Sequence, residues 1–272
     1  FDVVYGSSAG AMAGAYFLAG QARYGTTIYY QDINNADFIS LRRGLTRAPI
    51  MRTEFLLDHV CRAIKPLATE RILASGVDFG ALASSITERR AHVLRNFTSP
   101  DQVFEALRAS VNVPGVAGPP VPYGDDHYVD AALYQPIPFR AAVESGATHV
   151  LALLTRPHGV PKSRPSPVGR AFMRMRMRNL PAPIAADYIE AYAPYNAELA
   201  EMEHAAANPA AGGPQVHIVR LPTGTPAVGQ AEKNRDRLVA GAVAGCRQTM
   251  LEFGVTPGHV LEVIGVEPAV TD

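Results

Sequence analysis

The first twenty-two residues constrain the fold of this chain more than any other stretch. An apolar run comes first, the letters GSSAG follow at 6–10, and an alanine- and glycine-rich run continues to about residue 22. The turn has the pattern G-x-S-x-G, in which a strand bends sharply into a helix and the central residue, Ser8, projects from the bend. Small residues at Gly6 and Gly10 relieve crowding there, and the N–H of Ala9 at the helix start faces a developing oxyanion. The stretch therefore predicts a strand, a nucleophile elbow and a helix.

A membrane helix is the competing interpretation of the same residues. Gly6, Gly10 and Gly14 repeat the spacing G-x-x-x-G, and residues 3–22 carry no charge. Adjacent serines, a glutamine and four glycines lower the hydropathy below that of a typical span. The elbow is therefore favoured.

The composition is that of a globular protein without a strongly charged partner. The chain has 272 residues, enough for one large domain or two small ones, and 47% of them are hydrophobic. Its 25 basic and 25 acidic residues cancel, so nothing indicates a nucleic-acid partner. Cys61 and Cys246 lack metal-type spacing. Buried free thiols are expected for them, with a single disulfide left open.

Strand and helix patterns alternate along the chain. Beyond the first strand at 1–5, strands are expected within 76–97 on either side of 87–90, and at 127–129, 148–154 and 216–221. The apolar run at 148–154 predicts a buried strand. Helices are expected at 53–64, at 102–110 with Ser99 as N-cap and Pro100 at its first position, at 138–145, at 187–204 and at 231–253. Residues 23–49 and 156–183 look irregular, and 113–122 and 208–214 look like loops. The alternation predicts an α/β fold with mostly parallel strands.

A second residue, Asp130, is a candidate base for the serine. A serine hydroxyl is a poor nucleophile until a base takes its proton. Asp130 ends the short strand at 127–129 and precedes the small residues Ala131 and Ala132. Alone, it reads as a turn aspartate that caps Ala131 or Leu133. Together with the serine motif, a catalytic role is favoured.

The two motifs together, GSSAG at 6–10 and VDAAL at 129–133, resemble the patatin-like phospholipase family. That family pairs a G-x-S-x-G serine with the aspartate of a D-G-[GA] motif. Further similar segments extend the resemblance over essentially the whole chain: 109–115, 119–121, 147–154 and 224–253.

The resemblance implies one domain over 1–272, folded as a three-layer α/β/α sandwich with a mostly parallel central sheet. It implies a lipid acyl hydrolase that works through an acyl-enzyme, with Ser8 as nucleophile and Asp130 as general base. Gly6, Ala9 and Gly10 would form the elbow and part of the oxyanion hole. No cofactor and no metal is required by this chemistry, and the partner is a lipid or acyl-ester substrate.

Two departures from the family pattern stand out. Ala131 occupies the usual glycine position, where a positive φ would cost alanine about 1 kcal/mol. The family also carries a glycine-rich oxyanion loop before the elbow strand, whereas this sequence begins at Phe1. We therefore expect a domain that either is truncated at its N-terminus or lacks the loop, with the N–H of Ala9 remaining as oxyanion donor.

Two other functions stay open at this point. One is a Ser-Asp-His esterase of the α/β-hydrolase type, whose histidine would be found after Asp130. The histidines available for that role are His149, His158, His204, His217 and His259. The other is a non-catalytic lipid-binding protein.

Two polar segments have competing interpretations. Residues Arg170–Arg178 alternate arginine with methionine, which suits either peripheral contact with a lipid surface or a partly buried amphipathic segment. The location is left open, with the cytoplasm or the membrane periphery favoured, and the oligomeric state is also left open. Residues 125–127 (Asp-Asp-His) look superficially like metal ligands, but a solvated hairpin turn is favoured.

Overall fold

A computed structural model describes residues 1–209 and 213–266 of the chain. Its main sheet has five strands, and two further strands form a parallel pair. The strands are β1 (Val3–Ser7), β2 (Asp78–Ser85), β3 (Arg90–Leu94), β4 (Val121–Tyr123), β5 (Asp126–Asp130), β6 (His149–Leu154) and β7 (Gln215–Arg220). Parallel pairing joins β1 to β2 and β6 to β7, while β3 and β5 pair with β2, and β4 with β5, in antiparallel fashion.

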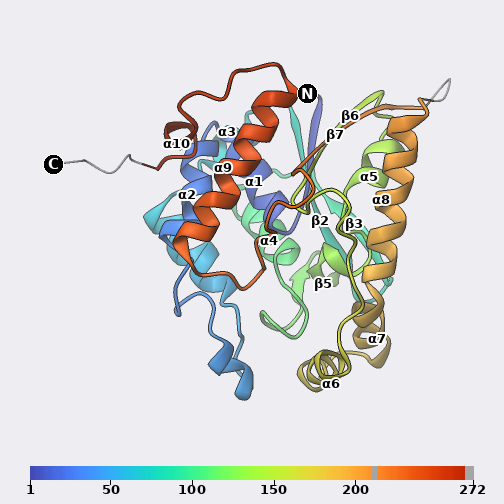
Figure 1. Cartoon of the computed structure of the whole chain (residues 1–272). Helices are drawn as coiled ribbons and strands as arrows, with labels where there is room; N and C mark the ends of the chain where they lie inside the picture. Colours follow the sequence, from blue (N-terminus) through green and yellow to red (C-terminus); the bar gives the residue numbers. More distant parts are fainter. Residues whose placement is uncertain (210–212, 267–272) are drawn as a thin grey trace.

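Helices cover both sides of these strands (Figure 1). On one side lie α1 (Ala9–Leu18), α2 (Ala22–Gln31), α3 (Thr69–Leu73), α4 (Pro100–Ser110) and α9 (Arg235–Glu252). On the other side lie α5 (Phe139–Glu144) and α8 (Tyr192–Ala207). The remaining elements are η1 (Leu41–Leu45), η2 (Phe55–Ile64), η3 (Ala131–Leu133), α6 (Pro167–Arg176), α7 (Ala182–Glu190) and α10 (Val260–Val263). The α/β/α sandwich expected from the sequence is confirmed.

The core is densest around β2. Its residues Phe79–Ser85 are all buried, because β1 and β5 cover one edge of the strand, β3 covers the other, and α1 and α4 pack on its face. Small side chains make close packing possible: Ala11 and Ala15 of α1 and Ala106 of α4 are fully buried.

The first helix is shorter than predicted. α1 ends at Leu18, and Gly20 follows with a φ of 69°, a conformation that glycine adopts without strain. The chain then enters α2, where we expected irregular structure. Two buried side chains, Ile28 and Tyr30, hold α2 in place despite its β-branched residues and glycine. A side chain at Gly25 would overlap the ring of Tyr16, so the glycine permits close helix packing.

Most other elements lie where the sequence places them. Ser99 caps α4, since its Oγ accepts a hydrogen bond from the N–H of Gln102 at 3.3 Å, and Pro100 begins the helix. The helix predicted at 53–64 exists, but residues 55–64 follow the wider hydrogen-bonding pattern of a π-helix. Both cysteines are free thiols, Cys61 buried and Cys246 half-buried.

Several predictions were wrong in the second half of the chain. The segment 156–183 is not irregular throughout, because it contains α6. The helix predicted at 187–204 is divided near Ala191 into α7 and α8. β6 was expected to be a buried strand, yet most of it is half-buried and Leu153 is 65% exposed. Part of the predicted loop 208–214 lies outside the described residues.

Within 1–209 and 213–266, no helix combines the length and the apolar character needed to cross a bilayer. The first helix packs inside the domain, with Ala11, Met12, Ala15 and Tyr16 buried.

Candidate active site

Ser8 occupies a strained bend between β1 and α1. Its φ of 53° and ψ of −122° are unusual for a residue with a side chain, as a nucleophile elbow requires. Gly6 is essential to this bend, because a Cβ there would lie 2.4 Å from the Cα of Ala11. Gly10 differs from our expectation, since a Cβ there would meet nothing within 4 Å. Only the first of the two elbow glycines is therefore required by space.

The strand register brings Asp130 to the same place. Along one edge of β2, Ser7 of β1 is paired with Leu82, and Asp130 of β5 is paired with the next residue, Ala83. β3 occupies the opposite edge of β2 over the same residues. β1 and β5 therefore lie end to end along a single edge, with their carboxyl ends facing. Since a strand advances by about 3.3 Å per residue, Ser8 leaves β1 close to where Asp130 ends β5.

The Asp130 carboxylate is buried, and only one of its two oxygens accepts a hydrogen bond of normal geometry from the described residues. The residue is 1% exposed, its Oδ1 accepts a hydrogen bond from the N–H of Ala132 at 2.8 Å, and its Oδ2 is buried. Within the described residues, no hydrogen bond of normal geometry reaches Oδ2. Burial raises the pKa of Asp130 to about 6, against the opposing effects of the Ser8 hydroxyl, the Ala132 N–H and the charge of Lys162.

Ala131 fits its position without strain. It is fully buried at the start of η3, and it is not among the residues with a positive φ. The strain expected from an alanine in the place of glycine is therefore absent. The capping role considered for Asp130 is real, but its partner is the N–H of Ala132.

One short segment at the end of α4 holds both candidate groups. The backbone N–H of Ser8 donates to Oγ of buried Ser110 at 3.0 Å. Two residues later, the carbonyl of Asn112 accepts from the N–H of Asp130, also at 3.0 Å. The Asn112 side chain fixes the following loop by hydrogen bonds with Gly118 and Pro119. Sequence reasoning did not identify these roles, although two small polar residues inside an apolar stretch were the available signal.

The start of α1 offers a candidate oxyanion donor. Within the described part of the chain, the backbone N–H of Ala9 donates no hydrogen bond. Its position after the strained serine is that of an elbow donor.

A cap of apolar side chains keeps water from the acid. Ile184 of α7 is fully buried and packs in one cluster with Val129 and Leu133, which flank Asp130, and with partly buried Tyr188. The half-buried Lys162 lies on the same side, and Asn196 holds its backbone through two 2.9 Å hydrogen bonds. The charge of Lys162 lowers the pKa of Asp130, while burial lowers the pKa of Lys162 itself.

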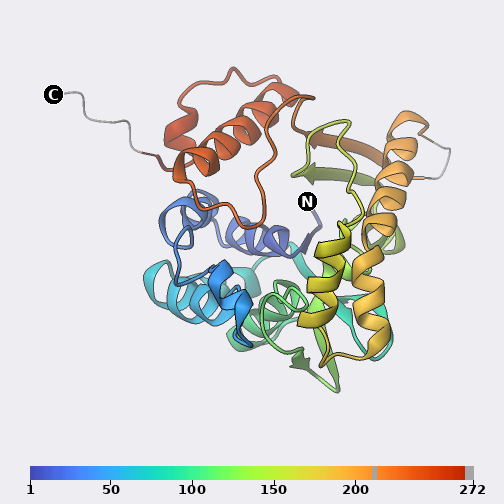
Figure 2. The ribbon, with the colours of Figure 1, turned by 60° about the horizontal axis from the view of Figure 1, so that its bottom comes forward.

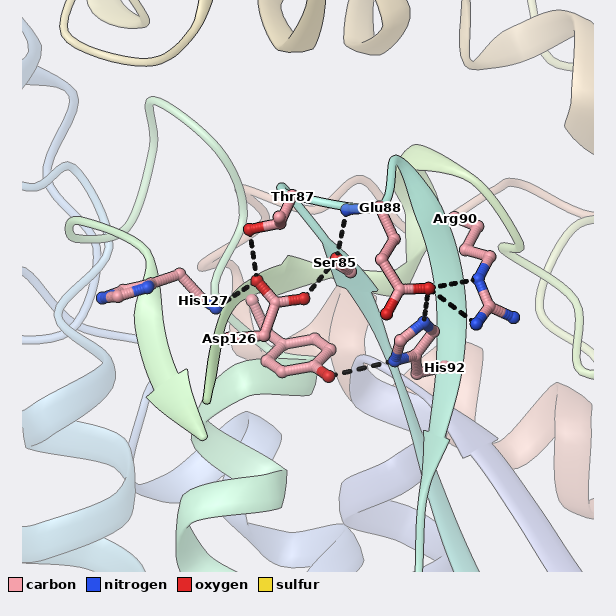
Figure 3. A network of polar contacts seen from close by, with 8 residues as sticks. Ser85, Thr87, Glu88, Arg90, His92, Asp126 and His127 are labelled. Carbon is pink, nitrogen blue, oxygen red and sulfur yellow. Dashed lines mark hydrogen bonds and ion pairs between the residues drawn. The ribbon is translucent and has the colours of Figure 1, made fainter. Parts of the chain in front are cut away.

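Figure 3 shows the polar network that fixes the other end of β5. Asp126 accepts hydrogen bonds from the hydroxyls of Ser85 and Thr87 and from the N–H of His127. Burial would raise the pKa of Asp126, but these three bonds outweigh it and hold the pKa below its usual value. The network ties β5 to the turn after β2, and so it helps to set the register that places Asp130.

Asp125 lies in the turn between β4 and β5, and Asp126 begins β5. Among the residues that the structure describes, no group of three or more histidine, cysteine or carboxylate side chains could hold a metal ion. Asp126 is instead saturated by hydroxyl and N–H donors.

The histidines considered for a triad interact elsewhere. His217 lies 3.5 Å from Glu252, His259 lies 3.6 Å from Glu262, and His149 contacts Thr148. In the described ranges, no histidine is hydrogen-bonded to Asp130 or to Ser8.

The fold and this geometry define the class: an α/β/α protein with a serine at a strand-to-helix elbow beside a buried carboxylate. Residues 1–143, more than half of the chain, match the family model of the patatin-like phospholipases. The chain therefore belongs to the patatin-like phospholipase family. No match was found among curated proteins. Family membership supports the general activity of a lipid acyl hydrolase, with a lipid as substrate.

Proposed function

We propose that this protein hydrolyses carboxylic esters of lipids with Ser8 as nucleophile and Asp130 as general base. The observation that carries the proposal is the end-to-end arrangement of β1 and β5 along β2, which leaves the strained serine beside a buried acid. Family membership supports a lipid as substrate, and we propose a phospholipid, lysophospholipid or acylglycerol ester.

In the first half of the reaction, Oγ of Ser8 attacks the ester carbonyl carbon while Asp130 takes the hydroxyl proton. The carbonyl oxygen becomes an oxyanion, which the N–H of Ala9 stabilises. The bond to the alcohol then breaks, and the leaving alkoxide receives the proton from Asp130. In the second half, Asp130 takes a proton from water, whose oxygen attacks the acyl carbon. The bond between that carbon and Oγ of Ser8 then breaks, Oγ receives the proton from Asp130, and the fatty acid is released.

The environment of Asp130 suits this role. An ordinary aspartate is too weak a base at neutral pH, because its pKa is near 3.9. Burial raises the pKa of Asp130 to about 6, which makes the carboxylate a better proton acceptor while it remains ionised at pH 7. The buried Oδ2, which has no hydrogen-bond partner of normal geometry in the described residues, is the oxygen that we assign to the proton.

The test compares Ser8→Ala and Asp130→Asn with the matched control Ser7→Ala, in the full chain. We expect each of the first two changes to lower hydrolysis of a lysophospholipid and of a soluble activated ester by at least about a thousandfold. The control, one residue away at the end of β1, should retain most activity. Retention of activity in either site variant would remove that residue from the mechanism.

A second measurement separates hydrolysis from mere lipid binding. A fluorophosphonate probe should label the wild-type protein at Ser8 and leave Ser8→Ala unlabelled. The rate of hydrolysis should rise with pH through an apparent pKa of about 6, since the ionised Asp130 is the active form. A protein that binds lipid vesicles but resists labelling would instead be a non-catalytic member of the family.

Single His→Ala variants distinguish the proposed Ser-Asp enzyme from a Ser-Asp-His esterase. We expect full activity from the alanine variants of His149, His158, His204, His217 and His259. Loss of activity in one of them, with the fold intact, would replace the dyad by a triad.

A further inference from the structure

Two segments of this neutral chain carry only positive charge. Between Asp37 and Glu54 there are four arginines and no carboxylate. Between Glu144 and Asp187 there are seven lysines and arginines, again with no carboxylate. Because acidic and basic residues are equal in number over the whole chain, this separation concentrates cationic charge on particular elements.

The two segments lie against each other in the fold. Arg176 of α6 donates hydrogen bonds to the carbonyl oxygens of Thr46 and Ala48, at 2.5 and 2.8 Å. A Cβ at Gly44 of η1 would lie 3.4 Å from the ring of Phe172. Figures 1 and 2 show η1, in blue, and α6, in yellow, as neighbouring projections. Elements more than a hundred residues apart thus form one surface, which we name the η1–α6 face.

Large apolar side chains are exposed on this face. On η1, Leu41 is 70% and Leu45 is 89% exposed. On α6, Val168 is 79% and Met175 is 51% exposed, and the helix has no fully buried residue. A helix that buries no side chain, next to two protruding leucines, presents apolar groups to something outside the domain.

Exposed arginines are close to these apolar groups in the sequence. Arg42 and Arg47 lie within two residues of Leu41 or Leu45, and Arg174 and Arg178 lie within three residues of Met175. Within the described residues, none of the four forms an ion pair, whereas Arg164 pairs with Glu190. Arginine around exposed leucine, phenylalanine and methionine is the composition of segments that lie in the interface of an anionic bilayer.

The face is connected to the candidate active site through one loop. Its inner side rests on the loop after α4, because Arg176 donates to the carbonyl of Gly115 at 2.9 Å and Ile50 donates to the carbonyl of Val116 at 2.8 Å. The same loop follows Ser110 and Asn112, which hold Ser8 and Asp130. A bilayer bound at this face would therefore lie at the end of the domain that carries the site.

We propose that the η1–α6 face docks the protein onto an anionic phospholipid bilayer, with the arginines at the headgroups and Leu41, Leu45 and Met175 at the acyl boundary. Charge complementarity selects an anionic surface, and the protruding leucines select a lipid rather than an acidic protein. The proposal adds a partner to the hydrolase and does not depend on Ser8 or Asp130 as catalytic groups.

The test measures binding of the full chain to vesicles in the Ser8→Ala background, so that hydrolysis cannot alter the membrane. Vesicles of phosphatidylcholine are compared with vesicles that also contain phosphatidylserine. We expect binding to the anionic vesicles that weakens with added salt. Arg174→Gln with Arg178→Gln should weaken it about thirtyfold, since each interfacial arginine contributes about a fivefold change in affinity.

Further variants test the contribution of η1 and whether the loss of vesicle binding is specific to the η1–α6 face. Leu41→Ser with Leu45→Ser should also weaken vesicle binding. The matched control, Arg247→Gln with Leu251→Ser, alters an exposed arginine and an exposed leucine of α9 and should leave binding unchanged. Thermal unfolding of each variant checks that the fold is intact.

Three outcomes would overturn the proposal. They are equal binding by the face and control variants, equal binding to neutral and anionic vesicles, or arginine-dependent binding to polyglutamate without binding to vesicles. The last would indicate an acidic protein partner. Because the soluble activated ester reports on Ser8 and Asp130 without a membrane, failure of this proposal is distinguishable from failure of the proposed function.

Discussion

The two parallel strand pairs of this protein differ sharply in how they are packed. In the first, β2 is buried from Phe79 to Ser85 between its neighbouring strands and under α1 and α4. In the second, β6 has no buried residue and β7 has one, Val219, while the adjacent α9 has none. The family model matches 1–143, which includes the first pair and not the second. The candidate dyad thus lies on the part of the molecule whose side chains have least freedom.

This difference in packing bears on how accurately each strand pair holds its side chains. Proton transfer requires heavy atoms within about 3 Å of each other. Rigid strands with locked side chains provide such placement better than loosely packed elements do. The second pair and the adjacent α9 leave apolar side chains exposed, for example Leu153 of β6 and Leu251 of α9.

The largest expected effect comes from truncating a leucine in each strand pair. Leu82 of β2 is fully buried, so Leu82→Ala should lower the free energy of unfolding by about 2–5 kcal/mol. Leu153 of β6 is 65% exposed, so Leu153→Ala should change it by less than about 0.5 kcal/mol. Urea denaturation of both variants measures the difference. Equal losses would show that the two pairs are equally packed in solution.

The next largest effect concerns one buried carboxyl group in each region, Asp130 in the first and Glu198 in the second. Because folding raises the pKa of Asp130 from 3.8 to about 6, the stability associated with its protonated form is present below about pH 4 and lost as the pH rises through 6. Asp130→Asn should therefore be more stable than wild type by about 3 kcal/mol at pH 7.5. The gain should vanish near pH 4.

Glu198 of α8 provides the comparison for this experiment. Burial also raises the pKa of Glu198, but its carboxylate accepts hydrogen bonds from Gln135 and from the N–H groups of Ile137 and Arg140. Glu198→Gln should thus gain less at neutral pH than Asp130→Asn. Denaturation midpoints at several pH values decide this, and a gain for Asp130→Asn that does not vary with pH would contradict the raised pKa.

The smallest expected effect comes from the helix caps. Ser99 caps α4, which packs on β2, whereas Asn234 caps α9 through a 3.0 Å hydrogen bond from Arg237. Ser99→Ala should lower global stability by about 1 kcal/mol. Asn234→Ala should mainly speed amide hydrogen exchange in the first turn of α9, since the helix has no buried residue. If Ser99→Ala and Asn234→Ala lowered global stability equally, the predicted difference between α4 and α9 would be contradicted.

Local sequence signals predicted much of the first region. The strained serine follows from G-x-S-x-G, and α4 follows from Ser99 and Pro100. These features depend on neighbouring residues and on backbone conformation alone. The identity of Asp130 as the second group came from a resemblance to a family, and its catalytic role is still a proposal.

Features set by tertiary packing were not predictable in the same way. α2 forms in a segment of poor helix propensity because Ile28 and Tyr30 are buried, and α6 forms among prolines because Arg176 and Met177 anchor it. The supports at Ser110 and Asn112 depend on contacts across long sequence separations. The end-to-end placement of β1 and β5 depends on strand register, which the pattern of side chains did not specify.

The anchoring of Ser8 and Asp130 to one stretch, 110–112, has a mechanical consequence. Both residues are hydrogen-bonded to this same three-residue stretch at the C-terminal end of α4. Thermal displacement of α4 would shift serine and acid together in the same direction. A shift of α4 would therefore change the separation between Ser8 and Asp130 less than it changes the position of either residue.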